Sequence, residues 1–220
     1  MSVVDPYARI ARALLGFDEP ERRIRSYAAL GDSFTAGTGC APGEPWADRL
    51  AAHLAERAPE FVYTNLAAEG ATSADVLEQV GPALQAEPDL VTVVCGANDV
   101  LFSVRPEPQL YARRLAAIFR RLLSPLPGLR IVTATAPERW DFIDLGPRTR
   151  ARLEGGIVRV NAATRQVART YDVPCLEVAG HPGLSDAQNF IADGLHPSPL
   201  GHRHAAAAFA RLLGLEEEQA

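Results

Sequence analysis

The sequence predicts a three-layer α/β fold, in which a parallel β-sheet lies between two layers of helices. Short apolar segments alternate along the chain with longer amphipathic ones, as expected when helices connect parallel strands. One short segment, 89–96 (DLVTVVCG), is apolar almost throughout, which is typical of a strand covered on both faces. The chain has 220 residues, of which 47% are hydrophobic and 22% charged, and these values fit one globular domain.

The predicted sheet has five strands, each a short run rich in apolar and β-branched residues. The first run, YAALG, breaks into Asp32 and Ser33, which is typical of a strand that ends at a sheet edge and leads into a helix. The intervals between the runs leave room for one helix each. The predicted strands are 27–31, 61–67, 89–96, 130–136 and 174–180.

The segments between the strands have the spacing of amphipathic helices. In the first of them, Trp46, Leu50 and Leu54 recur every four residues and form one apolar stripe. The fourth is long and polar, and we expect Gly155 and Gly156 to weaken it. The predicted helices are 44–58, 73–80, 108–126, 148–172 and 199–215.

A further short helix is predicted at 5–15, outside the alternating pattern. The sequence therefore predicts an N-terminal helical extension over residues 1–25 and a single α/β domain over residues 26–220. No internal repeat, low-complexity tract or linker divides this domain.

Charge and cysteine content argue against several classes of protein. The formal net charge is −5 and the 22 basic residues, all arginine, are scattered, so we expect no nucleic-acid partner. No segment approaches the roughly 18 apolar residues of a membrane span, and the charged N-terminal segment does not resemble a signal peptide. Cys40, Cys95 and Cys175 are odd in number and far apart, so no disulfide framework is implied. These features predict a cytoplasmic protein.

Residues that could carry chemistry follow the predicted strands. Ser33 follows the first strand, Gly70 the second and Asn98 the third. Asp193 and His196 lie in the loop after the fifth strand. Because the carboxyl ends of parallel strands meet at one edge, where open α/β sheets bind ligands, we expect these residues to converge.

This set of residue types meets the needs of acyl transfer. A serine hydroxyl becomes a good nucleophile when an imidazole removes its proton, and a carboxylate fixes the tautomer of that imidazole. Ser33, His196 and Asp193 could play these parts. The negative oxygen formed on attack needs several hydrogen-bond donors, which the Ser33 amide, the Gly70 amide and the Asn98 side chain could supply.

Four ordered segments resemble the sequence blocks of the GDSL esterases and lipases, also called SGNH hydrolases. They are GDSFTAG at 31–37, Gly70, GANDV at 96–100 and DGLHPSPLGH at 193–202. The first block reads GDSF rather than GDSL, and the resemblance spans residues 27–212. It implies a flavodoxin-like sheet of five parallel strands without metal or cofactor. It also implies that Ser33 is the nucleophile of a triad with Asp193 and His196, and that Ser33, Gly70 and Asn98 form the oxyanion hole.

Several of these residues also have a purely structural interpretation. Ser33 could serve only as a helix N-cap, Asp193 only as a turn cap, and Asn98 only as a partner of the loop backbone. Gly70 could serve only a turn. For Asp32, next to the serine, we favour a role in bracing its loop, and we assign the same role to Asp99.

Metal, thiol and nucleotide chemistry are poorly supported. His202 and His204 lie two apart on a predicted helix and so point to different faces, which leaves His196 without partners for a zinc site. Cys95 lies inside an apolar strand and is expected in the core. The chain has no lysine for a phosphate-binding loop.

The sequence therefore predicts a serine esterase that hydrolyses a small-to-medium soluble ester through an acyl-enzyme. An acyltransferase, a thioesterase or a carbohydrate deacetylase would use the same residues, and a non-catalytic flavodoxin-like binding module is an alternative of another class. After the fourth strand, Trp140 and Phe142 either seal the end of the sheet or form the wall of a substrate pocket.

Overall fold

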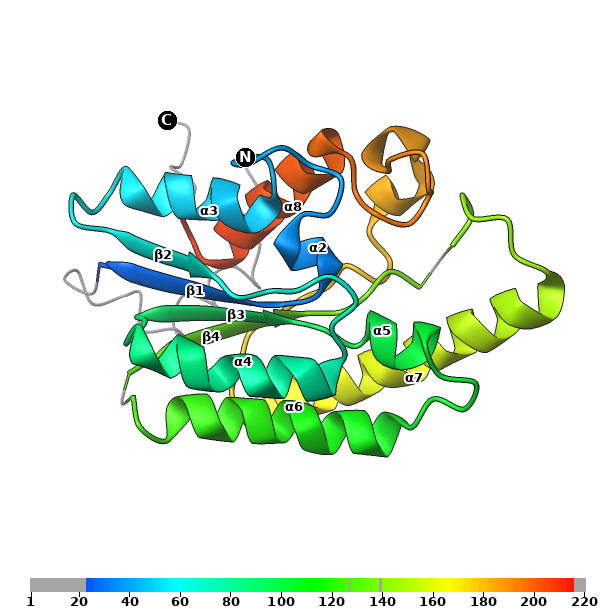
Figure 1. Cartoon of the computed structure of the whole chain (residues 1–220), viewed down its shortest axis with the longest axis horizontal. Coiled ribbons are helices and arrows are strands. Elements are labelled where there is room, and N and C mark those ends of the chain that lie inside the picture. Colours follow the sequence, from blue (N-terminus) through cyan, green and yellow to red (C-terminus); the bar gives the residue numbers. More distant parts are fainter. Residues whose placement is uncertain (1–22, 127, 139, 216–220) are drawn as a thin grey trace, which may run out of the picture.

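A computed structural model describes residues 23–126, 128–138 and 140–215 and confirms the predicted three-layer α/β fold (Figure 1). The strands are β1 (Ser26–Gly31), β2 (Val62–Asn65), β3 (Leu90–Val94), β4 (Arg130–Ala134) and β5 (Cys175–Leu176). They form one parallel sheet in the order β2-β1-β3-β4-β5. This is the flavodoxin-like order, in which the direction of winding reverses between β1 and β3.

Helices cover both faces of the sheet (Figure 1). They are α2 (Ser33–Ala36), α3 (Trp46–Ala55), α4 (Ser73–Gln85), α5 (Ala97–Leu101), α6 (Pro108–Leu123), α7 (Pro147–Thr170) and α8 (Pro199–Leu212). One face carries α3 and α8, and the other carries α4, α6 and α7. The short helices α2 and α5 follow β1 and β3, and the 3-10 helices η1 (Pro182–Ser185) and η2 (Ala187–Asn189) precede α8.

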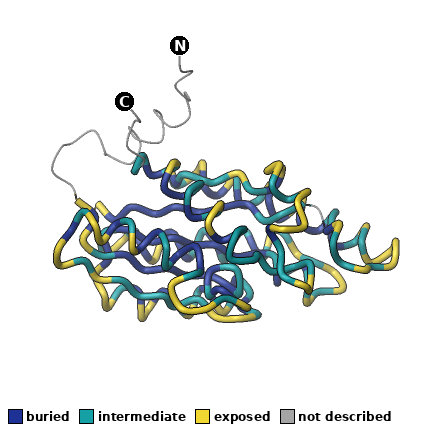
Figure 2. The backbone as a smooth tube through the Cα atoms, turned by 90° about the horizontal axis from the view of Figure 1, so that it is seen from above, coloured by how far each residue is buried: buried dark blue, intermediate teal, exposed yellow. Residues whose placement is uncertain are grey.

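Alternating side chains along the central strands build one core on each face of the sheet. In β1, Ala28 and Leu30 belong to the core beneath α4, α6 and α7, whereas Tyr27 and Ala29 belong to the core beneath α3 and α8. All residues of β3 are buried, as the apolar segment predicts. Figure 2 shows burial concentrated in the strands and on the inner sides of the helices. The sheet is therefore a rigid base for the loops at its edge.

Helix α7 runs unbroken from Pro147 to Thr170, through the two glycines that were expected to weaken it. A Cβ at Gly156 would come within 2.5 Å of Cγ1 of Val100, on α5. The glycine thus permits a close contact between the two helices. This tertiary packing offsets the low helix propensity of glycine, which is about 1 kcal/mol below that of alanine.

Helix α4 continues beyond the predicted end at residue 80. It reaches Gln85 and includes Pro82. Ala83 is buried like Val76 and Val80, so the apolar stripe that faces the core extends over the added turn.

The strand predicted at 174–180 is paired only at Cys175 and Leu176. Beyond it, the Thr135 hydroxyl accepts hydrogen bonds from the amides of Val178 and Ala179, at 2.9 and 3.0 Å. A side chain therefore replaces the backbone pairing that would have continued the strand.

The helix predicted at 5–15 lies outside the described residues, and the extension over residues 1–25 stays a prediction. Within the described ranges, no helix is both long enough and apolar enough to cross a bilayer.

The first turn of α3 is capped by a histidine that is distant in sequence. The Trp46 amide donates to Nδ1 of His202 at 3.1 Å, whereas the N-cap residue Pro45 supplies no side-chain hydrogen bond. His202 is fully buried, and its ring stacks on Phe34 with 5.9 Å between centroids. Burial disfavours the imidazolium and, with repulsion from Arg49, lowers the pKa of His202 from 6.5 to about 4. The neutral ring can therefore accept the Trp46 hydrogen bond.

We expect the stability that His202 contributes to fall as the pH drops from about 6.5 to about 4. In this window the unfolded chain binds a proton at residue 202 and the folded chain does not, so acid favours unfolding there. In a His202→Asn variant, the side-chain oxygen can accept from Trp46 without titrating. The native protein should therefore lose roughly 2–3 kcal/mol more unfolding free energy than this variant over the window.

Urea unfolding of both proteins at about pH 7 and about pH 4 measures this difference. Using the difference between the two proteins cancels the titration of other groups. Equal losses in both proteins would contradict the assignment.

Candidate active site

The strands β1 and β3 deliver two polar side chains to the same edge of the sheet. They are direct neighbours, and Gly31 pairs with Val94 at their carboxyl ends. Helix α2 begins at Ser33 after β1, and Asn98 lies in the first turn of α5 after β3. Both residues line one cavity, at the point of the sheet where the winding reverses and ligands are usually bound.

Contacts on both sides hold the backbone at Ser33. Asp32 is the N-cap of α2, and its Oδ1 accepts from the Phe34 amide at 3.1 Å. Gln79 of α4 brackets Gly31, accepting from its N–H and donating to its carbonyl, both at 2.9 Å. These contacts fix the serine at the end of β1.

A chain of hydrogen bonds joins Ser33, His196 and Asp193. Ser33 Oγ lies 3.0 Å from His196 Nε2, and His196 Nδ1 lies 2.6 Å from Asp193 Oδ2. The other oxygen, Asp193 Oδ1, accepts from the amides of Leu195 at 2.8 Å and His196 at 2.9 Å. The carboxylate thus folds its own loop and orients the imidazole.

Electrostatics determine which group donates and which accepts in these hydrogen bonds. Burial opposes ionisation of Asp193, but hydrogen bonds from the His196 ring and from the amides of His196 and Leu195 outweigh it and lower the pKa of the carboxyl. Asp193 is therefore ionised at neutral pH and accepts the Nδ1–H of His196. That tautomer leaves Nε2 free to accept the hydroxyl proton of Ser33.

A second carboxyl group beside the serine has a different environment. Asp32 is 5% exposed. Its burial raises its pKa to about 7, although the Phe34 amide opposes the shift. Asp99 accepts from both the amide and the hydroxyl of Ser73, at 2.8 and 2.5 Å. Asp32 and Asp99 therefore have the loop-bracing contacts that the sequence predicts.

Gly70 and Asn98 line the same cavity as Ser33. Asn98 is 6% exposed, and its Nδ2 donates to the Ala71 carbonyl at 3.0 Å, which leaves its second amide hydrogen available. Gly70 has a φ of +73°, a conformation that favours glycine. Within the described chain, the amides of Ser33 and Gly70 have no hydrogen-bond acceptor. Three N–H groups at this cavity are thus available to donate hydrogen bonds: the amides of Ser33 and Gly70 and the second amide hydrogen of Asn98.

An aromatic pair supports the loop at 190–197. The rings of Phe142 and Phe190 pack with 5.3 Å between their centroids. Gly194 has a φ of +67°, and a Cβ there would lie 2.3 Å from the Phe142 carbonyl oxygen. Glycine is therefore required where the loop crosses the segment after β4.

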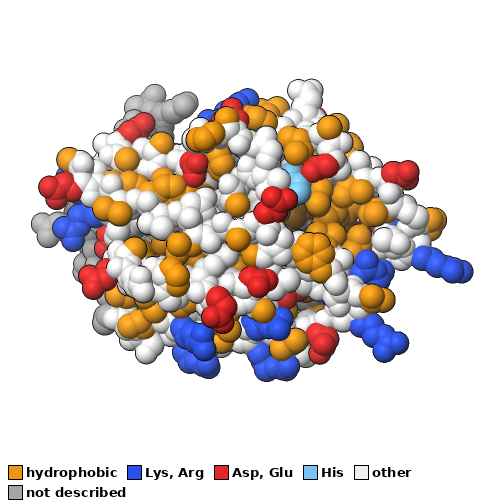
Figure 3. All heavy atoms as spheres, viewed as in Figure 1, with side chains coloured by type: hydrophobic (Ala, Val, Ile, Leu, Met, Phe, Trp, Pro, Cys, Tyr) orange, Lys and Arg blue, Asp and Glu red, His pale blue; other side chains and the backbone are white. Residues whose placement is uncertain are grey.

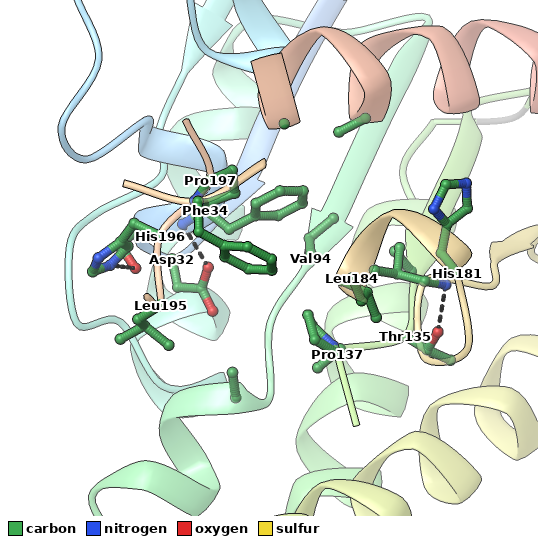
Figure 4. Close-up of a pocket in the computed structure, with 18 of the residues that line it drawn as sticks. Asp32, Phe34, Val94, Thr135, Pro137, His181, Leu184, Leu195, His196 and Pro197 are labelled. Atoms are coloured by element: carbon green, nitrogen blue, oxygen red, sulfur yellow. Dashed lines mark hydrogen bonds between the residues drawn. The ribbon is translucent and has the colours of Figure 1, made fainter. Parts of the chain in front are cut away.

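A cavity of about 460 Å³ opens beside the serine and the histidine. Figure 3 shows a hollow lined by apolar side chains next to a histidine and acidic groups. In Figure 4, His196 and Asp32 lie at one end, Leu184 and His181 at the other, and Val94 between them. The apolar wall includes Val94, Ala134, Leu176, Leu184, Ala205 and Ala208.

The two aromatic residues predicted after β4 differ in position. Trp140 lines the cavity and is also buried in the core on the α7 side, so it takes part in both. Phe142 is not among the lining residues and adjoins the cavity through Phe190 and Gly194, which do line it. Arg150 fixes the segment by donating to the carbonyls of Trp140 and Ile143, at 2.6 and 2.9 Å.

Two residues that support the site were missed in the sequence. Asn161 of α7 brackets Ala136 with two hydrogen bonds of 2.8 Å, just as Gln79 of α4 brackets Gly31. Each side-chain amide fixes the carboxyl end of a strand. The available signal was a polar residue on the buried side of a predicted helix, where an unpaired amide would be costly.

The other histidines near the site do not gather around His196. His202 caps α3, and Nδ1 of His204 lies 3.0 Å from Oδ1 of Asn189. The described residues contain no group of three or more His, Cys, Asp or Glu side chains that could hold a metal ion.

Solved structures share this fold. A lipase/acylhydrolase from Enterococcus faecalis is 23% identical, with 90% of this chain and 100% of that chain covered and a TM-score of 0.69. The esterase EstA from Pseudoalteromonas sp. is 19% identical, with 86% and 97% covered and a TM-score of 0.67. A variant of an acetyl-xylooligosaccharide esterase from Geobacillus is 19% identical, with 90% and 100% covered and a TM-score of 0.71. At these identities the likeness concerns the fold alone.

No curated protein sequence matches the chain. Residues 29–204, however, match the model of the GDSL-like lipase/acylhydrolase family. This range contains all the sequence blocks that suggested the resemblance and most of the chain. The protein therefore belongs to the GDSL-like lipase/acylhydrolase family.

Proposed function

We propose that the protein is a serine esterase that hydrolyses small-to-medium soluble carboxylic esters. The observation that carries this proposal is the hydrogen-bonded chain from Ser33 through His196 to Asp193, at 3.0 and 2.6 Å, beside an apolar cavity. Such a chain turns a weak hydroxyl nucleophile into a reactive one.

In the first half-reaction, Ser33 Oγ attacks the ester carbonyl carbon while Nε2 of His196 takes the hydroxyl proton. Asp193 stabilises the imidazolium that results. The bond to the alcohol oxygen then breaks, and that oxygen takes the proton from His196. The alcohol leaves, and the acyl group remains on Ser33.

In the second half-reaction, a water molecule replaces the alcohol. His196 takes a proton from the water while the water oxygen attacks the acyl carbon. The bond to Ser33 Oγ breaks, the serine regains its proton from His196, and the carboxylic acid leaves.

The negative oxygen of each tetrahedral intermediate needs donors that are already in place. We assign this role to the amides of Ser33 and Gly70 and to the free Nδ2 hydrogen of Asn98. The contact between Asn98 and the Ala71 carbonyl holds the side-chain amide in position before substrate binds.

The apolar part of the cavity is proposed to bind the acyl chain. Burial of hydrocarbon there is favourable by about 25 cal/mol per Å² of apolar surface. Trp140 contributes to the wall directly, and Phe142 supports it by packing on Phe190.

The same acyl-enzyme could pass its acyl group to an alcohol, and product analysis with added alcohol separates transfer from hydrolysis.

A cytoplasmic location remains part of the proposal. The three cysteines are free thiols, which is the usual state in a reducing compartment.

Replacing Ser33 by alanine should abolish ester hydrolysis and labelling by a fluorophosphonate probe. The fold should persist because Asp32, and not Ser33, caps α2. Turnover of p-nitrophenyl butyrate, probe labelling and thermal unfolding are measured for the native protein, for Ser33→Ala and for Ser185→Ala, an exposed serine outside the cavity, as control. Labelling or turnover by a pure Ser33→Ala protein would sink the assignment.

Replacing Asn98 by alanine should lower kcat by roughly 10²–10³-fold, the usual loss for one oxyanion donor. KM should change little, because the donor acts mainly on the charge that develops in the transition state. Steady-state kinetics and a thermal melt distinguish this result from unfolding. An effect on KM alone would place Asn98 in ground-state binding.

Replacing Ala208 by leucine should shift the preferred acyl chain to a shorter length. Ala208 lines the apolar part of the cavity from α8, so a larger side chain removes space there. The measurement is kcat/KM over p-nitrophenyl esters of increasing chain length, with Ala207→Leu on the same helix as control. An unchanged optimum would show that the acyl chain lies elsewhere.

A further inference from the structure

We propose that Phe102 selects the alcohol arm of the ester by packing its ring against a neutral, hydroxyl-bearing ring, as in a sugar. This inference deepens the proposed esterase function and rests on it. It adds to the acyl pocket a second recognition site, on the opposite arm of the substrate.

Phe102 combines two properties that are unusual together. Its side chain lines the cavity, and yet the residue is 69% exposed. Aromatic surface in water is unfavourable, so a ligand that covers this ring gains binding free energy. Val104, two residues further on, is 85% exposed but does not line the cavity. The two residues form a matched pair for experiment.

Helix geometry places Phe102 next to the proposed oxyanion donors. Its amide donates to the carbonyl of Asn98, four residues earlier, at 3.1 Å, so the two side chains lie on the same side of α5. A Cβ at Gly70 would lie 3.8 Å from the Phe102 ring. The ring is therefore beside the reacting carbonyl of a bound ester.

The backbone that carries this ring is held by α7. Arg152 donates through Nη1 to the carbonyl of Val100 at 3.2 Å and also to the carbonyl of Ser103. A ring on a fixed turn loses less conformational entropy on binding than one on a loose loop.

The order of the two half-reactions decides which arm lies against Phe102. The acyl arm stays on Ser33 through both, which suits the apolar wall that extends to Leu184. The alcohol arm must leave before water enters, and so it needs the open side of the cavity. Phe102 and Glu69 both line the cavity and are both exposed, which identifies that side.

Glu69 gives the open side its chemical preference. Its carboxylate has no hydrogen-bond or ion-pair partner within the described chain. It can therefore accept hydrogen bonds from hydroxyl groups, and it repels anionic alcohols. A carboxylate beside an aromatic face fits a ring with C–H groups on its face and hydroxyls at its edge.

The test uses one acyl group on three alcohols: the butyrate esters of methanol, cyclohexanol and the 6-hydroxyl of methyl glucoside. We expect Phe102→Ala to lower kcat/KM for both ring esters by about 3- to 10-fold relative to the methyl ester. Phe102→Trp should keep the native ratios, and Val104→Ala should leave them unchanged. Deacylation of the butyryl-enzyme, followed after a burst with p-nitrophenyl butyrate, should have the native rate in every variant.

Two results would overturn the inference: an equal loss for all three esters, or slower deacylation in Phe102→Ala. Either would place Phe102 on the acyl arm or give it a purely structural role. Fluorophosphonate labelling of Ser33 in the native protein is established first. If the protein is labelled and either result is found, only the role of Phe102 is contradicted. If the protein is not labelled, the proposed esterase function itself is contradicted.

Discussion

The parallel pairing of β1 with β3 is the constraint on which the rest of the site depends. The helices α3 and α4 and the strand β2 separate them in the chain, but their carboxyl ends lie side by side, with Gly31 opposite Val94. Ser33 begins α2 and Asn98 lies in the first turn of α5, so the backbone of the sheet positions both residues. A serine on an unpaired loop would not be held at a constant distance from a donor on another loop.

At this edge, side-chain amides form hydrogen bonds with backbone groups that strand pairing does not satisfy. Where β1 and β4 end, Gln79 and Asn161 satisfy the N–H and carbonyl groups of Gly31 and Ala136. Gly31 is buried, and an unpaired polar group at such a position would destabilise the folded state by about 1–3 kcal/mol. The same hydrogen bonds therefore stabilise the fold and position the residues that emerge from the strands.

The polar and apolar parts of the site are built by different segments. The polar groups follow β1, β2 and β3 or lie in the short loop closed by the hydrogen bonds of Asp193, whereas the apolar walls come largely from strand ends and α8. A carboxyl group in this site is ionised where the hydrogen bonds that it accepts outweigh the effect of burial. Asp193, with three hydrogen bonds, has a lowered pKa, and Asp32, buried with fewer, has a raised one.

The sequence by itself determined the alternation of strands and helices, the parallel sheet and the residues that meet at its edge. These follow from periodicity and from the rule that carboxyl ends of parallel strands converge, so no long-range contact had to be known. Only the tertiary structure decided the close packing of Gly156 on Val100, the His202 cap on α3 and the different positions of Trp140 and Phe142. Each of these features depends on contacts between segments that are distant in the chain, and the local sequence pattern does not specify such contacts. The tertiary structure also decided the size of the cavity, because its volume is the space that remains after the helices and loops have packed.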